Sequence, residues 1–216
     1  MNEQSNKIYS IKKDNKPIKG CTLSKTVCAD EYYISYFSLA SDTDISAEVY
    51  TYHKLMIVNE GVLTAYAEDK TYTLKEGDIF LTPKNIPVGI KTNTGGIYTE
   101  ITLKENTVMN EILKAGEIFS LKDMVPYAEG KIVNMDLIKD PKLKFVLMSF
   151  DEGTGLSEHA APGEAIIFAL DGEAIIGYEG KEYRISAGEN FKFDKMGKHY
   201  VTADHKFKMA LLLKLD

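Results

Sequence analysis

Two histidines in the second half of the chain are the residues best suited to chemistry. His159 and His199 are far apart in sequence, and Asp171-Gly172 and Gly188 mark turns between the apolar runs that separate them. Strands that return through such turns lie side by side, so the two imidazoles are expected to meet inside a small barrel. Imidazole binds transition metals and exchanges protons near neutral pH, so this pair marks the predicted site.

Glu164 is the candidate for a third metal ligand. It follows Pro162-Gly163, and a bend there could disturb the alternation of side chains enough to turn the carboxylate toward the histidines. His159, His199 and Glu164 would then hold one divalent ion, for which Mn, Fe, Ni, Zn and Cu are all suitable. The alternative is a metal-free pocket in which the histidines bond to each other or to a bound acid. Both alternatives stay open, and no residue is assigned a catalytic role.

These histidines belong to the later copy of an internal repeat. Ile8–Lys12 and Gly20 match Ile118–Lys122 and Gly130 at one constant displacement. Further along, residues of the first half recur in order and at constant spacing in the second: Ser38, Thr43, Ser46, Gly61, Glu68, Tyr72, Gly77 and Phe80 match Ser149, Thr154, Ser157, Gly172, Glu179, Tyr183, Gly188 and Phe191. Each copy has the size of a small domain, which indicates a duplication.

Within each copy the sequence pattern is all-β. Runs rich in β-branched and aromatic residues predict strands at Tyr33–Leu39, Val49–Val58, Val62–Ala67, Tyr72–Leu74 and Tyr98–Leu103. Asn59-Glu60-Gly61 and Asp171-Gly172 have the composition of hairpin turns. Many short strands separated by turns are typical of a sandwich or barrel.

One stretch, Val108–Ala115, has a helix-like pattern and stops at Gly116. It lies where a connector between the copies is needed. The sequence therefore predicts an N-terminal barrel at residues 1–107, a helical connector at 108–116 and a C-terminal barrel at 117–216.

The second copy resembles the cupin superfamily, whose first motif is G-x5-H-x-H-x3,4-E-x6-G. Gly153, His159 and Gly172 stand at the spacing of that motif, and Gly188 and His199 stand at the spacing of the second, G-x5-P-x-G-x2-H-x3-N. The resemblance implies two tandem double-stranded β-helix barrels of the jelly-roll type, a bicupin.

The stretch Leu156–Pro162 also looks like the LSEH-x-AP signature of small single-domain cupins. The chain departs from the cupin motifs at several positions, which are occupied here by Ala161, Ala165, Asp194, Met196 and Ala203. Of the ligands that the resemblance implies, only the two histidines stand in register.

The first copy departs further from the cupin motifs than the second does. Glu48 stands where the second copy has His159, Tyr50 where it has Ala161, and Val88 where it has His199. The first barrel is therefore expected to carry a degenerate site and to act as a structural partner, forming an intramolecular pseudo-dimer with the second. Exposed edge strands leave a homodimer open.

The resemblance implies a wide range of functions, because cupins include dioxygenases, isomerases, decarboxylases and ligand sensors. The interpretation is a protein that binds a small polar molecule in the C-terminal barrel. One alternative is a metal-dependent enzyme of isomerase or oxygenase type, and the other is a metal-free, non-catalytic sensor.

Bulk composition narrows the remaining classes. The 216 residues are 44% hydrophobic and 27% charged, which is ordinary for a globular protein. A net charge of −6 without a basic stripe argues against nucleic-acid binding. No apolar run is long enough to span a membrane, and the polar N-terminal stretch has no secretion signal. Cys21 and Cys28 are expected to be reduced thiols in a cytoplasmic protein.

Overall fold

A computed structural model describes residues 1–29 and 32–215 of the chain. They form two compact units. One contains Ile11–Thr107 with Met1–Asn2 and Glu111–Ser120, and the other contains Glu3–Ser10, Val108–Asn110 and the chain from Leu121 on. Relative to the sequence-based bounds, residues 3–10 lie in the second unit and residues 117–120 in the first, and the predicted connector 108–116 is divided between the units after Asn110.

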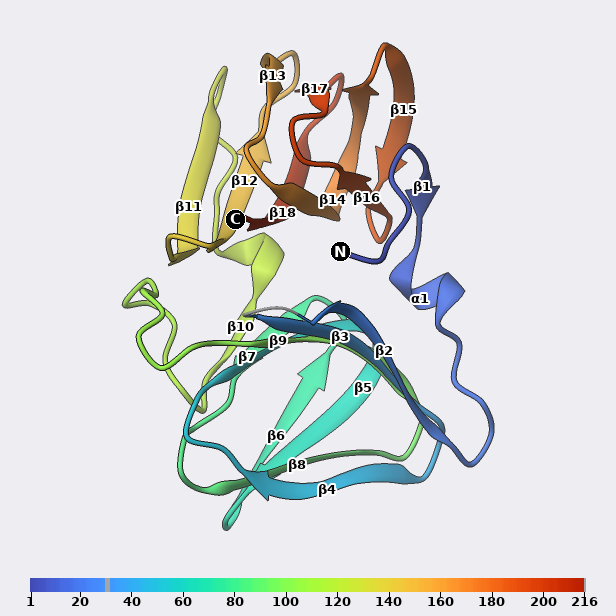
Figure 1. The fold of residues 1–216 in the computed structure, drawn as a ribbon, viewed down its shortest axis with the longest axis vertical. Coiled ribbons are helices and arrows are strands. Elements are labelled where there is room, and N and C mark those ends of the chain that lie inside the picture. Colours follow the sequence, from blue (N-terminus) through green and yellow to red (C-terminus); the bar gives the residue numbers. More distant parts are fainter. Residues whose placement is uncertain (30–31, 216) are drawn as a thin grey trace. The chain divides into compact units, whose positions relative to one another are not determined.

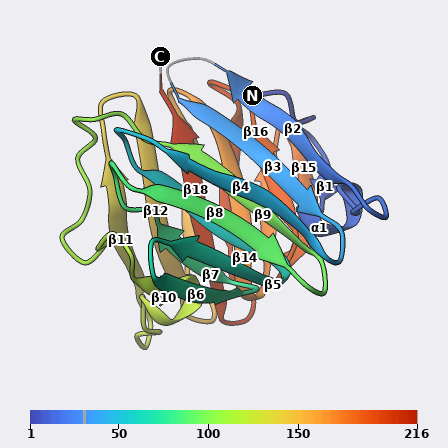
Figure 2. The ribbon, with the colours of Figure 1, turned by 90° about the horizontal axis from the view of Figure 1, so that it is seen from below.

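The first unit consists of antiparallel strands that curl into a barrel (Figure 1). Its main path runs β10-β7-β5-β9-β3-β2, while β4 pairs with β8, and β8 and β6 both pair with β5. Its elements are α1 (Ile11–Asp14), β2 (Thr22–Ala29), β3 (Tyr33–Leu39), β4 (Thr43–Val49), β5 (Lys54–Ala67), β6 (Lys70–Lys75), β7 (Asp78–Leu81), β8 (Pro87–Thr92), β9 (Gly96–Thr102) and β10 (Ile118–Ser120). Figure 2 shows β2 lying along β3, its hydrogen-bonded neighbour.

The second unit repeats this arrangement strand for strand. Its path runs β1-β16-β14-β18-β12-β11, while β13 pairs with β17, and β17 and β15 both pair with β14. Its elements are β1 (Ile8–Tyr9), η1 (Leu121–Asp123), β11 (Ile132–Lys139), β12 (Leu143–Phe150), β13 (Gly155–Ala160), β14 (Glu164–Tyr178), β15 (Lys181–Ser186), β16 (Asn190–Phe193), β17 (Lys198–Thr202) and β18 (Phe207–Lys214). The predicted all-β jelly-roll class is confirmed.

A single bent strand, β14, closes the second barrel. Before Gly172 it pairs with β16 and β18, and after it with β15 and β17. The register shifts between Ala169 and Asp171, and Gly172 follows with a φ of 70°. Such a bulge bends a strand sharply, so one continuous strand can serve both faces of the barrel.

The equivalent strand β5 bends at Gly61, where φ is 82° and the register shifts between Val58 and Glu60. The turns predicted from the sequence at residues 59–61 and 171–172 are therefore wrong. The positive φ that glycine permits is used to bend a strand, and each strand continues beyond the bend.

The helix predicted at Val108–Ala115 is also wrong. Met109 forms an isolated antiparallel bridge with Ile138, and the residues that follow form turns. Gly116 closes the segment, with its N–H donating to the carbonyl of Leu81 at 2.9 Å. A helix of eight residues has too few hydrogen bonds to offset its nucleation, so these pairings prevail.

In the part of the chain that the structure describes, helix is limited to the short α1 and η1. No helix among the described residues has the length and apolar character needed to cross a membrane.

Short segments extend the edge of each sheet. Ile8 of β1 lies opposite Phe191 of β16 in the second unit, and Ile118 of β10 lies opposite Phe80 of β7 in the first. The repeated pentads at 8–12 and 118–122 thus begin with residues that have equivalent pairings. Each pairing satisfies backbone groups that would otherwise be left at a sheet edge.

Aromatic side chains fill the core of the second unit near the predicted site. Phe191 and Phe193 are almost fully buried, and their ring centroids lie 5.2 Å apart. Tyr178 packs on both rings. The corresponding core of the first unit is formed by Leu39, Met56, Val58, Leu63, Ala65, Leu74, Phe80, Ile90 and Tyr98.

The bend in β14 generates a testable prediction. In Gly172→Ala, the new Cβ would lie 1.9 Å from the Lys206 carbonyl oxygen, at a φ that alanine disfavours. We expect a loss of about 3 kcal/mol or more in the free energy of unfolding, measured by urea denaturation and circular dichroism.

Gly153→Ala is the matched control, because Gly153 has a φ of 78° but nothing within 4 Å of the added Cβ. It should lose only about 1 kcal/mol. Equal losses in the two variants would show that the close approach at the bend does not govern stability.

Candidate functional site

The two predicted histidines lie directly opposite each other. His159 is on β13 and His199 is on β17, and the two residues are register partners in this antiparallel pair. The register shifts between Leu156 and His159, so a local irregularity precedes the first histidine. On its other side β17 pairs with β14, where Tyr178 is the partner of His199. The barrel thus brings the histidines together as the sequence predicts.

Backbone carbonyls fix the orientation of both rings. The ring centroids are 4.3 Å apart with their planes tilted by 54°. Nδ1 of His159 lies 2.8 Å from the Ser157 carbonyl oxygen, and Nδ1 of His199 lies 2.9 Å from that of Gly197. A carbonyl oxygen only accepts hydrogen bonds, so each Nδ1 carries the ring proton. In the neutral rings both Nε2 atoms are therefore acceptors.

The two rings differ in environment. His199 is only 6% exposed and stacks on Phe193, with centroids 4.0 Å apart and planes 20° from parallel. His159 is exposed. Burial lowers the pKa of His199, the hydrogen bond to Gly197 opposes that shift, and a charge on His159 lowers it further. His199 is therefore held neutral by its apolar surroundings, while His159 faces solvent.

Glu164, the third predicted ligand, makes a different contact. Its carboxylate lies 2.9 Å from Nζ of Lys192, which is also 2.8 Å from Asp194. Lys192 is 4% exposed, whereas the two carboxylate side chains that it contacts are partly exposed. Burial opposes ionisation of Glu164, but hydrogen bonds from cationic groups, that of Lys192 among them, lower its pKa overall.

Strand alternation explains this placement. Ala165 belongs to the core cluster with Phe193, so the neighbouring Glu164 projects from the other face of β14. Among the residues that the structure describes, no three of His, Cys, Asp or Glu come together in a group able to hold a metal ion. The structure brings His159 and His199 together without Glu164.

A second polar cluster lies in the first unit, and the sequence analysis did not identify its central pair. Nζ of Lys54 is 3.0 Å from a carboxylate oxygen of Glu100, and the two side chains are 17% and 13% exposed. The same ammonium lies 3.8 Å from the centroid of the Tyr50 ring. Lys54 lies two residues before Met56 on β5, and Glu100 lies two residues after Tyr98 on β9. Residues two apart on a strand face the same side, so both charged side chains share the side of these core residues.

Glu48 completes this cluster. It is exposed, and its carboxylate accepts a hydrogen bond from the Tyr50 hydroxyl. Burial raises the pKa of Glu100; Lys54 opposes the rise, and the charge of Glu48 adds to it. Two carboxylates and one ammonium therefore share this part of the first barrel.

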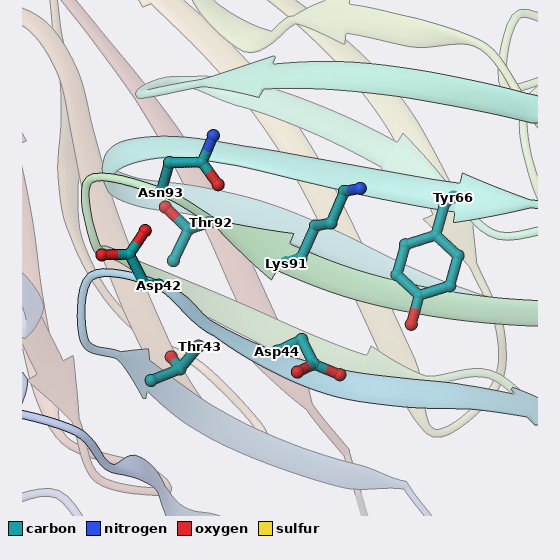
Figure 3. Close-up of a pocket in the computed structure, with 7 residues that line it drawn as sticks. All are labelled: Asp42, Thr43, Asp44, Tyr66, Lys91, Thr92 and Asn93. Atoms are coloured by element: carbon teal, nitrogen blue, oxygen red, sulfur yellow. The ribbon is translucent and has the colours of Figure 1, made fainter.

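A separate groove of about 400 Å³ lies over β4 and β8 (Figure 3). Asp44 is the register partner of Lys91, whose ammonium is 5.8 Å from the Tyr66 ring centroid. Ile45 and Ile90, which adjoin these residues, pack in the core, so the groove is on the outer face of the strands. Its lining is Asp42, Thr43, Asp44, Tyr66, Lys91, Thr92 and Asn93.

Two protein-family models match successive parts of the chain. Residues 36–135 match an AraC-like ligand binding domain, and residues 146–213 match a cupin domain. A search of curated proteins found no match.

Solved structures give the same assignment. A cupin 2 conserved barrel domain protein from Leptotrichia buccalis is 28% identical, with a TM-score of 0.87 over 99% of this chain and 98% of that one. The chain has the cupin fold. Both family matches support its assignment to the cupin superfamily.

More distant structures share the fold. A salicylate 1,2-dioxygenase variant from Pseudoaminobacter salicylatoxidans is 11% identical, with a TM-score of 0.64 over 85% of this chain and 70% of that one. AerE from Microcystis aeruginosa is 14% identical, with a TM-score of 0.55 over 92% and 95% of the two chains.

Within residues 1–29 and 32–215, this cupin fold brings together too few ligands for a complete metal site. The two Nε2 atoms are donors suited to a transition metal, and their carbonyl-bound Nδ1 atoms resemble the usual support for a metal-bound histidine. A tight site needs three or four protein ligands. Ala161 and Ala165 stand where the first cupin motif has its second His and its Glu, and Glu164 is bound to Lys192.

The signal for the first-barrel cluster was present in the repeat. At the spacing that aligns Gly61 with Gly172, Lys54 corresponds to Ala165 and Glu100 to Leu211. Charged residues therefore occupy core-facing positions that are apolar in the second copy. Comparing the two copies at their core-facing positions alone would have identified Lys54 and Glu100.

The environment of His199 predicts its titration. Its imidazole should titrate below the ordinary value of about 6.5, measured by the NMR shift of 13Cε1 as pH is varied. In His159→Asn the pKa of His199 should rise, because the neighbouring charge is removed, but should stay lowered, because Phe193 still buries the ring.

The lowered pKa of His199 also predicts how the free energy of unfolding depends on pH. A group whose pKa is lower in the folded state binds more protons when unfolded, so the free energy of unfolding should fall as pH drops below about 6.5. The fall should be smaller in His199→Gln. A His199 pKa at or above the ordinary value would contradict this account of the site.

Proposed function

We propose that the chain binds a compact polar small molecule at His159 and His199, in the second barrel. The observation that carries this proposal is the pairing of two imidazoles whose Nδ1 atoms are bound to the backbone, which leaves both Nε2 atoms available. One ring is exposed, and the other rests on Phe193, so the pair has a polar side and an apolar support. This combination is typical of small-molecule sites.

The ligand is a hydrogen-bond donor, such as a hydroxy or carboxylic acid. Two neutral Nε2 atoms accept hydrogen bonds and so select a ligand that offers hydroxyl or acid protons. An acid can instead transfer its proton to His159 and bind as a carboxylate beside the imidazolium. Burial lowers the pKa of His199, which favours the neutral form that accepts a hydrogen bond from the ligand.

The match of residues 36–135 to an AraC-like ligand binding domain supports a binding role. The chain is proposed to be a metal-free, non-catalytic bicupin that arose by duplication. The equal strand orders of the two units and the constant spacing of the repeat support that origin.

A metal-dependent enzyme of isomerase or oxygenase type is the second candidate. One observation favours it, which is that both histidines expose Nε2 while Nδ1 is bound to a carbonyl, as metal-bound histidines commonly do. Substrate or solvent oxygens would have to complete the coordination of a Mn, Fe, Ni, Zn or Cu ion. Such a metal would supply Lewis-acid or redox chemistry.

Binding can be tested with lactate and salicylate as compact hydroxy-acid probes. Both should produce saturable shifts of the His159 and His199 13Cε1 resonances. Affinity should fall by about tenfold or more in His199→Gln, because one of the two acceptors is replaced. His205→Gln is the control, since His205 is 65% exposed and should not contribute. Shifts that persist unchanged in both variants would refute binding at the pair.

Metal content separates the two candidates. Untagged protein should be incubated in turn with Mn, Fe, Ni, Zn and Cu and dialysed, and its metal measured by plasma mass spectrometry. The metal-free proposal predicts less than stoichiometric metal in every case, because only two protein ligands are present. One equivalent of a metal that is lost in His159→Ala would instead establish the second candidate.

A further inference from the structure

We propose that the first barrel binds a small organic amine between Glu48 and Glu100. This assigns a ligand to a unit expected from its sequence to be only a structural partner. The site is independent of the histidine pair, because all of its residues lie in the first unit.

The first step is the balance of charge. Lys54 neutralises one of two carboxylates, so the ionised cluster keeps one negative charge. The remaining charge is on Glu48, which is exposed and therefore accessible to a cation from solution. Burial and the charge of Glu48 both disfavour ionisation of Glu100, and Lys54 only partly offsets them. A ligand that brings one positive charge removes the remaining imbalance.

The second step concerns the existing partners of each group. The Lys54 ammonium contacts both Glu100 and the face of the Tyr50 ring. Its positive charge is therefore already engaged, which disfavours an anionic ligand at this point. Glu48 is exposed, with the Tyr50 hydroxyl as a partner. A carboxylate has room for several hydrogen bonds, so Glu48 can still accept from an ammonium.

The third step is the apolar wall beside the charges. Phe37 and Tyr98 are register partners on β3 and β9, and their rings stack with centroids 5.0 Å apart. Tyr98 lies two residues before Glu100, on the same face of β9. Burial and the charge of Glu100 both raise the pKa of the Tyr98 hydroxyl. Phe37 is only half-buried. An amine with an aromatic group could place its ring there and its ammonium at the carboxylates.

The second barrel provides an internal comparison. Its residues at the positions of Lys54 and Glu100 are Ala165 and Leu211, which pack in or against its aromatic core. The same backbone therefore closes without charges at these positions. The fold does not require the ion pair of the first barrel, so these charges are available to serve binding.

The test uses benzylammonium, with benzyl alcohol and benzoate as the neutral and anionic analogues. The reporter is the 13C-methyl resonance of Met56, which is the register partner of Glu100. Benzylammonium should shift this resonance saturably, while benzyl alcohol and benzoate should bind about tenfold more weakly or not at all. Added salt should weaken the interaction.

Two variants locate the binding groups. Glu48→Gln changes an exposed side chain, so it should lower the affinity for benzylammonium by about tenfold without a loss of thermal stability. Glu100→Gln should lower the affinity for benzylammonium further. Glu105→Gln is the control, because Glu105 is an exposed residue of the same unit that lies outside the cluster. Benzylammonium affinity that is unchanged in Glu48→Gln would overturn the proposal, as would tighter binding of benzoate than of benzylammonium.

Discussion

The bend in one long strand of each unit is the constraint on which the site geometry depends. β14 leaves one set of partners and joins another at Gly172, where a Cβ would overlap the carbonyl of Lys206. Beyond the bend the strand pairs with β17, and β17 pairs with β13. The position of the two histidines therefore follows from a backbone contact that only glycine permits. β5 and Gly61 have the same relation in the first unit.

This shared backbone explains why the two units can differ in chemistry without differing in fold. The paired positions on β13 and β17 carry His159 and His199, and the equivalents on β4 and β8 carry Glu48 and Val88. Backbone hydrogen bonds set the register, and these are indifferent to side-chain charge. The second unit fills its core with aromatic rings, which leaves His199 on an apolar support. The first unit carries the ion pair of Lys54 with Glu100 at two core-facing positions that are apolar in the second unit.

The sequence predicted the all-β class and the meeting of the histidines because both follow from local pattern and repeated spacing. It failed at Gly61 and Gly172, because composition reveals the need for a positive φ but not whether the chain reverses or only bends. The helix predicted at 108–115 was wrong because the bridge between Met109 and Ile138 is a long-range contact, which a local pattern does not reveal. Such tertiary pairings override weak local propensity.

Glu164 and Lys54 show why site residues are harder to predict than folds. A shift of one position along a strand moves a side chain to the opposite face. Glu164 is adjacent to the core-facing Ala165, and Lys192 provides a buried countercharge on its own side. The contact with this ammonium stabilises the ionised carboxylate where it lies, so the ion pair resists any rotation of Glu164 toward the histidines. In the first barrel the enclosed charges of Lys54 and Glu100 compensate each other, and the exposed Glu48 is the carboxylate that a cation from solution can reach.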